Sequence, residues 1–161
     1  MSRTAIPAIA LAAVAAAVAI PALSSEAQTS GPRDITVREK VRTVKIDDLK
    51  PRSRDDRLSQ GDRVLTRQEL YDARNRRIGT LYTDCANVGG TAKVFKATLQ
   101  CVVTYRFGDG QVEAAGVARL APGQRLAIVG GTGAYKGVSG EVETAPPVKG
   151  YDSVDILHIE P

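Results

Sequence analysis

Polar and apolar residues alternate along the segment 94–107, and this alternation is the clearest structural signal in the sequence. One set of alternate positions is apolar: Phe95, Ala97, Leu99, Cys101, Val103, Tyr105 and Phe107. The other set is polar apart from Val94 and Val102: Lys96, Thr98, Gln100, Thr104 and Arg106. A period of two over this length predicts an antiparallel strand with one face buried and one face in water.

Turn-forming residues divide the chain after residue 27 into similar pieces, none of which sustains a helical period. The strongest turn signals are Gly108-Asp-Gly110 and Gly130-Gly-Thr-Gly133. We expect strands near 36–47, 62–72, 77–88, 94–107, 111–120, 124–129, 138–145 and 151–159, and a long loop over Lys50–Gln60. Eight strands with short connections predict an all-β fold, an eight-stranded antiparallel up-and-down β-barrel. A barrel of this size is filled by side chains or holds one small ligand.

The first 27 residues differ from the rest of the chain. Arg3 is followed by an Ala-rich stretch without charge from Ala5 to Leu23, and small residues surround Ala27. This pattern is typical of a signal peptide cleaved after Ala27, although an uncleaved membrane anchor also fits it. We therefore expect a secreted or extracytoplasmic protein with no stable membrane span after cleavage. Residues 28–35 would form a flexible N-terminal segment, and 36–161 the barrel domain.

Composition narrows the function classes further. The 161 residues suit one domain. Aromatic residues make up 4% of the chain and Trp is absent, which argues against nucleic acid as a partner, because single strands bind by stacking on aromatic rings. One His and two Cys are too few for a structural zinc site, so we expect no metal and no cofactor. The net charge is +4. The 33–77 segment has 14 basic and 9 acidic residues, which suits either an anionic surface or an ordinary mixed-charge face.

The glycine-rich segment Ala127–Val142, AIVGGTGAYKGVSGEV, resembles the signature of the allene oxide cyclase barrel family, which is related in fold to the plant dirigent proteins. The glycines would permit positive φ and close backbone approach where one strand bends into the next. Weaker similarities extend over roughly residues 61–142, at Gly61-Asp62, Leu70-Tyr71, Arg77-Ile-Gly79, Cys85, Phe95-Lys-Ala-Thr98 and Phe107-Gly-Asp109. The resemblance implies a barrel with a cavity and a homo-oligomer, either a trimer or a dimer.

The site residues that the resemblance implies are mostly replaced. The glutamate and asparagine that the cyclases carry on their first strand fall on Lys45 and Asp47, and a second-strand asparagine falls on Gln68. The tyrosine of the fifth strand falls on Ala118, and Cys85 alone is kept. Lys45 would reverse the charge that steers an epoxide-opening transition state. The arginine that follows the dirigent glycine run is Ser139 here.

Cys85 has two interpretations. As in the cyclases, it could be a free thiol that lines the cavity. Alternatively it forms a disulfide with Cys101, because export supplies an oxidising compartment. A turn near Gly90 would place Cys85 opposite a residue near position 97, so that Cys101 is slightly offset, within what a bulge or longer loop can correct.

The remaining polar candidates are Asp47, Gln68, Asp84 and Asp155. A carboxylate inside a small apolar barrel would have a raised pKa and could act as an acid or base, whereas each of these residues could instead face water. Gln68 is the best candidate to face inward, and Asp47 and Gln68 are the candidate catalytic residues. The candidate ligand-binding residues are Val64, Thr66, Gln68, Phe95, Leu99 and Tyr105. We expect the lone His158 to be structural.

Three functions remain open. In the first, an exported barrel binds an apolar small molecule in its lumen, as a carrier or a dirigent-like template. In the second, the barrel is a cyclase or isomerase that holds an unsaturated or epoxide substrate in a productive shape. In the third, the lumen is packed solid and the protein has a structural or interaction role. Fold resemblance alone does not decide among them.

Overall fold

A computed structural model describes residues 31–49 and 57–161 of the chain. The predicted signal peptide over 1–27 and most of the expected loop Lys50–Gln60 lie outside the described residues. Within those two ranges, no helix is long and apolar enough to cross a membrane.

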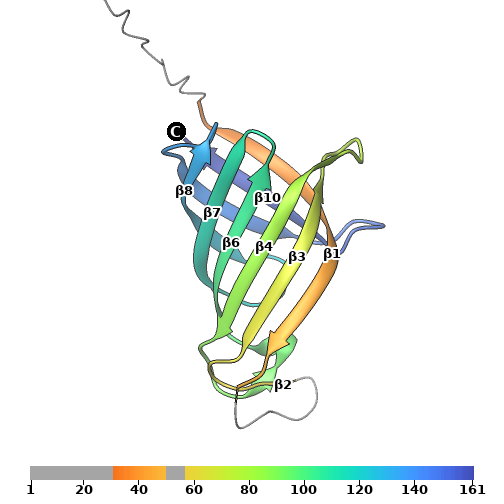
Figure 1. The fold of residues 1–161 in the computed structure, drawn as a ribbon, viewed down its shortest axis with the longest axis vertical. Coiled ribbons are helices and arrows are strands. Elements are labelled where there is room, and N and C mark those ends of the chain that lie inside the picture. The colour runs from red at the N-terminus through yellow and green to blue at the C-terminus, as the bar shows by residue number, and fades with distance from the viewer. Residues whose placement is uncertain (1–30, 50–56) are drawn as a thin grey trace, which may run out of the picture.

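The chain folds into a closed antiparallel barrel, as the alternation predicts (Figure 1). Around the ring the order is β1-β10-β9-β8-β7-β6-β4-β3. These strands are β1 (Arg33–Asp47), β3 (Arg63–Tyr71), β4 (Arg77–Asn87), β6 (Leu99–Phe107), β7 (Gly110–Ala118), β8 (Arg125–Gly133), β9 (Ser139–Ala145) and β10 (Ser153–Glu160). β1 closes the ring because it pairs with β10 on one side and with β3 on the other. It begins at Arg33, inside the segment 28–35 that was expected to be flexible.

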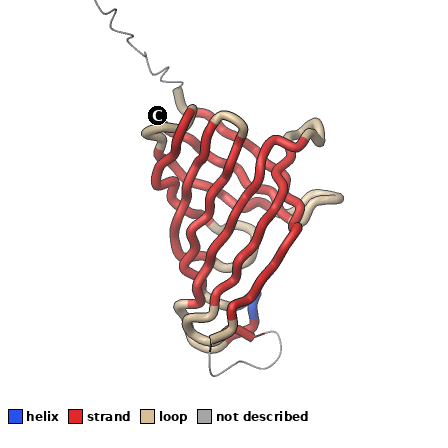
Figure 2. The backbone as a smooth tube through the Cα atoms, in the orientation of Figure 1, coloured by secondary structure: helices blue, strands red, loops and turns tan. Residues whose placement is uncertain are grey.

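Two expectations about the connections need correction. The segment 94–107 is not one strand, because Val94–Lys96 form a turn of 3-10 helix before β6 begins at Leu99. The expected loop Lys50–Gln60 contains a short strand, β2 (Arg57–Leu58), which pairs with β5 (Ala92–Lys93). This two-stranded sheet and the 3-10 turn cover one end of the barrel (Figure 2).

The opposite half of the barrel is packed solid. Its inward side chains are large and form one buried cluster, which includes Val37, Leu70, Leu81, Tyr105, Val112, Ile128, Val142, Leu157 and Ile159. A second cluster lies beneath the covered end: Leu58, Val64, Cys85, Ala97, Leu99 and Cys101. Burial of these aliphatic side chains is the main source of stability in a fold of this size.

The glycine-rich segment connects β8 to β9, and its glycines have the mechanical role expected for them. Gly133 has a φ of +60° and Gly140 a φ of +123°, backbone conformations that favour glycine. A Cβ at Gly140 would collide with the carbonyl oxygen of His158 on the paired strand β10. The run therefore lets strands approach closely and turn sharply.

Candidate functional site

The half of the barrel toward the covered end is hollow. It encloses a cavity of about 600 Å³. The wall is made of successive paired positions across β1, β3, β4 and β6: Val41–Gln68–Leu81–Tyr105, Val44–Thr66–Thr83–Val103 and Ile46–Val64–Cys85–Cys101. Beyond Val112, the next strand, β7, contributes small inward residues: Ala114, Gly116 and Ala118. Small side chains at these positions leave the lumen unfilled, so a barrel packed solid throughout is excluded.

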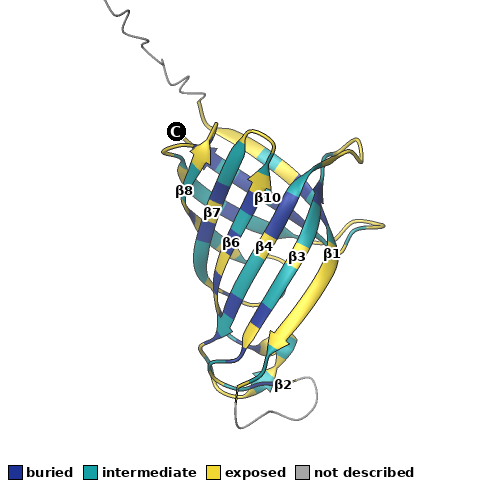
Figure 3. Cartoon of the chain, in the orientation of Figure 1, coloured by how far each residue is buried: buried dark blue, intermediate teal, exposed yellow. Residues whose placement is uncertain are grey.

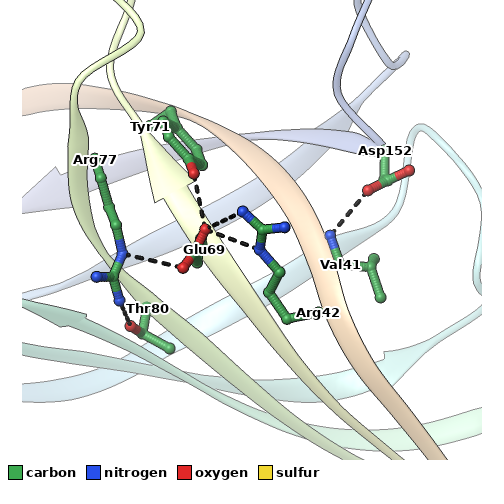
Figure 4. A network of polar contacts seen from close by, with 7 residues as sticks. All are labelled: Val41, Arg42, Glu69, Tyr71, Arg77, Thr80 and Asp152. Atoms are coloured by element: carbon green, nitrogen blue, oxygen red, sulfur yellow. Dashed lines mark hydrogen bonds and ion pairs between the residues drawn. The ribbon is translucent and has the colours of Figure 1, made fainter.

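The cavity opens through the side of the barrel, where β1 separates from β10. Their ladder ends at the pair Glu39–Ser153. Asp152 then holds the edge of β1: its Oδ2 accepts the Val41 N–H at 2.8 Å (Figure 4), and its own N–H donates to the Glu39 carbonyl at 2.9 Å. Beyond this point β1 pairs with β3 alone, and its C-terminal half is largely exposed (Figure 3).

Apolar side chains surround this opening. Val44 and Ile46 lie on the β1 side and are 58% and 45% exposed, and Phe95 of the 3-10 turn is 74% exposed. The other side is formed by the β7–β8 and β9–β10 loops: Leu120, Ala121, Pro122 and Pro147. The mouth is thus accessible to an apolar molecule from solvent.

A β-bulge at Arg42 decides which residues of β1 reach the cavity. The register with β3 shifts between Val41 and Thr43, so the inward positions change from odd to even numbers. Arg42 itself turns to the outer face, where its guanidinium donates to Glu69 at 2.8 Å (Figure 4). Lys45 and Asp47 therefore pair with each other at 2.8 Å on the outer face. Asp47, a candidate catalytic residue from the sequence, does not line the cavity.

The inner end of the cavity is polar, although it is buried. Tyr105 on β6 donates a hydrogen bond of 2.5 Å to Asp155 on β10, and the Glu39 side chain on β1 lies close to Asp155. Glu39 is 2% and Asp155 6% exposed. Burial, followed by the charge of Asp155, raises the pKa of Glu39 well above its ordinary value. Burial likewise raises the pKa of Tyr105, which keeps the phenol a hydrogen-bond donor.

This arrangement can hold and release a proton inside an apolar cavity. Two carboxyls in contact share one proton, because both cannot be ionised cheaply at close range. The raised pKa of Glu39 favours its protonated form, which is the form that a general acid needs. Within the described ranges, no group of three or more His, Cys, Asp or Glu side chains is arranged to hold a metal ion.

Cys85 and Cys101 form a disulfide, which confirms that alternative. They are direct partners across β4 and β6, without the expected offset, because the connection from 88 to 98 is longer than a tight turn. The disulfide contributes to the cavity wall, so neither sulfur is a free thiol.

The other residues predicted from the sequence are divided between inside and outside. Val64, Thr66 and Gln68 line the cavity, as does Tyr105. Phe95 lies at the mouth instead of on the β6 wall. Leu99 is fully buried in the cluster that closes the barrel end.

Of the four polar candidates, Gln68 and Asp155 face inward, and Asp47 and Asp84 face outward. Asp84 pairs with Arg63 on the outer wall. For Asp155, the preferred interpretation that it faces water is wrong, because its side chain is buried and the residue is only 6% exposed. His158 lies on the outer face and contacts Asp34 through Nδ1 at 2.8 Å.

Glu39 was missed by the sequence interpretation. Val37, Glu39 and Val41 are alternate residues between Arg38, Lys40 and Arg42, so a carboxylate stands on the apolar face of the first strand. That pattern was the available signal. The family resemblance placed the glutamate at Lys45, in the C-terminal half of the strand, whereas the buried carboxylate is Glu39 in its N-terminal half.

Comparison with known proteins supports the same fold. A sequence profile of the family described as "Allene oxide cyclase barrel like domain" matches residues 39–155. No curated protein matches the sequence. Among solved structures, a pyocyanin demethylase is similar with a TM-score of 0.65 at 20% identity, over 79% of this chain and 99% of the other.

Two further structures are similar at lower identity. A pterocarpan synthase dirigent protein has a TM-score of 0.60 at 16% identity, over 82% of this chain and 95% of the other. An exo-specific intermolecular Diels-Alderase has a TM-score of 0.56 at 14% identity, over 82% of this chain and 100% of the other. At these identities the similarity concerns the fold alone.

Proposed function

Because this chain belongs to the allene oxide cyclase barrel-like family, we propose that it binds an apolar small molecule in the hollow half of its barrel. The observation that carries this proposal is the cavity of about 600 Å³, with aliphatic walls and a few buried polar groups at its inner end. Sites for small molecules commonly have this composition. The similar structures named above are likewise named for small organic molecules or for reactions of such molecules.

Binding is tested with 1-pyrenemethanol, a neutral apolar probe whose fluorescence reports its surroundings. We expect saturable binding to the wild-type protein. Thr83 lines the cavity and Thr104 is the next residue of the paired strand, on the outer wall. Thr83→Trp should weaken binding at least about tenfold by filling the cavity, and Thr104→Trp should leave it unchanged. Equal binding by both variants would place the probe outside the lumen.

A second candidate function is supported by the buried Glu39. We propose that, with an unsaturated epoxide, the neutral Glu39 carboxyl transfers its proton to the epoxide oxygen as the C–O bond breaks. The substrate then cyclises or rearranges, and a proton lost from its carbon framework returns to the Glu39 carboxylate. Gln68 would orient the substrate from the neighbouring strand, and the enclosing wall would hold it in a reactive shape.

The enzyme proposal is tested by following the loss of an unsaturated epoxide and the release of an isomer of the same mass. Glu39→Gln should abolish turnover, and Gln68→Leu should reduce it. The rate should fall as the pH rises through the raised pKa of Glu39, because the acid form is consumed. Asp47→Asn on the outer face is the matched control and should retain full activity. Loss of activity in Asp47→Asn together with normal activity in Glu39→Gln would reverse the assignment.

We also propose that the protein is exported with cleavage after Ala27. The charge-free stretch that follows Arg3 supports this proposal, and a disulfide suits an oxidising compartment. N-terminal sequencing of the protein from its host should begin at Gln28. An intact Met1 on membrane-bound protein would instead support the anchor.

A further inference from the structure

Three buried side-chain oxygens at the inner end of the cavity have no hydrogen-bond partner within the described part of the chain. They are Glu39 Oε1, Gln68 Oε1 and Asp155 Oδ1, and all three residues line the cavity. The amide nitrogen of Gln68 is directed to Thr66 Oγ1 at 3.4 Å, which leaves its oxygen for the lumen. Gln68 Oε1 is a hydrogen-bond acceptor, and the Glu39–Asp155 pair, whose four oxygens share one proton, can accept more hydrogen bonds than it can donate.

The charged residues that line the cavity are also mostly acidic. The acidic lining residues are Glu39, Asp152 and Asp155, whereas Arg119, in the β7–β8 loop at the mouth, is the one basic residue among the described lining. The shared proton of the Glu39–Asp155 pair leaves a negative charge at the inner end. The Tyr105 hydroxyl already donates its only hydrogen to Asp155, so it is not available to donate to a ligand. The inner end of the cavity therefore offers hydrogen-bond acceptors and a negative charge to the end of a ligand that reaches it.

We infer that the ligand of this cavity carries a protonated nitrogen with N–H groups, such as an ammonium or an N-protonated heteroaromatic ring, at the end of an apolar body. This inference rests on the proposed function and names the ligand class for the same site. A ligand that fills the cavity covers the three oxygens, and a covered acceptor without a donor weakens binding. A cationic N–H group supplies donors and opposes the charge, so its hydrogen bonds are the stronger, charge-assisted kind.

Other head groups fit this end of the cavity less well. A hydrocarbon leaves every acceptor unpaired, and an alcohol supplies one donor without charge. A carboxylate brings further acceptors and a like charge into a buried site, which is doubly unfavourable. The expected order of affinity is amine, alcohol and then carboxylate.

Three probes with the same ring system test this order: 1-pyrenemethylamine, 1-pyrenemethanol and 1-pyrenecarboxylate, titrated into the wild-type protein at pH 7. We expect the amine to bind at least about tenfold more tightly than the alcohol, and the carboxylate at least about tenfold more weakly. Equal affinity for all three would overturn the inference and leave the proposed binding function intact. Failure of all three to bind would overturn both.

Asp155→Asn and its outer-wall counterpart Asp84→Asn locate the preference. Asp155→Asn should bring the amine within about threefold of the alcohol. Asp84→Asn removes an equivalent carboxylate that pairs with Arg63 outside the barrel and should keep the full preference. Binding of the alcohol reports that each variant retains its cavity. If Asp155→Asn does not fold, Gln68→Leu serves in its place, because it removes one of the unpartnered acceptors of the cavity. A preference that survives both cavity variants would contradict the inference.

Discussion

Tyr105 on β6 and Asp155 on β10 are joined by a hydrogen bond of 2.5 Å across the lumen of the barrel. β6 and β10 stand opposite each other in the ring of strands, so this contact ties two walls that share no backbone ladder. It also lies between the packed half of the barrel and the hollow half. The polar end of the cavity is therefore fixed by a long-range contact between side chains.

Removing the phenol hydroxyl should destabilise the protein. In Tyr105→Phe, the buried Asp155 loses the hydroxyl that donates to it, and we expect the free energy of unfolding to fall by about 1.5–3 kcal/mol, as for hydrogen bonds to charged groups. Urea denaturation at pH 7 measures this change. Tyr82→Phe is the control, because Tyr82 is 43% exposed on the outer wall. Equal midpoints for the two variants would show that the contact across the lumen contributes nothing.

Glu39 should make the fold less stable as the pH rises. Burial and the charge of Asp155 raise the pKa of Glu39 above the ordinary value of 4.5, so the folded protein keeps a proton that the unfolded chain has released. This contribution is complete below the ordinary pKa and is lost as the pH rises through the raised one. Glu39→Gln should therefore gain stability relative to wild type, by up to about 1.4 kcal/mol per pH unit within that window.

Urea denaturation of wild type and Glu39→Gln between pH 4.5 and about pH 8 measures this difference. The titratable groups that face Glu39 are Asp155, Asp152 and Tyr105, and both proteins contain them. Glu141→Gln is the outer-wall control and should not show the slope. A constant difference between wild type and Glu39→Gln would contradict the prediction.

Loss of the disulfide should be costly because it closes a loop between residues 16 positions apart. The double variant Cys85→Ala, Cys101→Ala should lose about 3 kcal/mol of stability, if the cross-link acts mainly on the unfolded chain. Thermal and urea denaturation with and without a reducing agent measure the effect. The reducing agent should lower the stability of wild type toward that of the variant and leave the variant unaffected.

Gly140 should not tolerate a side chain. Gly140→Ala places a methyl group against the His158 carbonyl at a φ of +123°, so we expect a loss of about 2–4 kcal/mol from strain and displacement of β10. Gly90→Ala is the matched control, because a Cβ there has no atom within 4 Å. A stability loss shared by both variants would point to a general effect of the Gly→Ala change.

The outer wall offers a surface for the homo-oligomer that the family resemblance implies. Val102, Val117 and Val129 on β6, β7 and β8 are 49%, 57% and 62% exposed, and exposed apolar surface can mark an interaction site. Sedimentation velocity should show wild type as a dimer or trimer and the double variant Val102→Lys, Val117→Lys as a monomer. Val148→Lys, in the β9–β10 loop, should leave the assembly unchanged. A monomeric wild type would refute this expectation.

The strands were predictable because each carries its own pattern. The alternation from Leu99 to Phe107 indicates both the strand and its buried face, and the glycines at 130–133 indicate a sharp connection. Such signals are local, since a strand with one wet face must alternate. Closure into a barrel followed from the number of strands and their short connections.

The site was harder to predict because it depends on two non-local features. The bulge at Arg42 changes which alternate residues of β1 face the lumen, and no residue type in that stretch indicates a bulge. Lys45 and Asp47, at the positions of the family's site residues, therefore face outward, whereas Glu39 lies before the bulge and lines the cavity. The contact of Tyr105 with Asp155 joins residues 50 positions apart, and only the closed ring brings them together. Register and closure, more than residue type, decide the chemistry here.

The solid half and the hollow half of the barrel depend on different side chains. Leu70, Val112 and Leu157 fill the first, whereas Thr66, Thr83 and Ala118 surround the second. Replacements in the second set can alter what enters the lumen while the scaffold keeps its anchoring residues. A lineage with this design is free to acquire new specificities without first gaining extra stability.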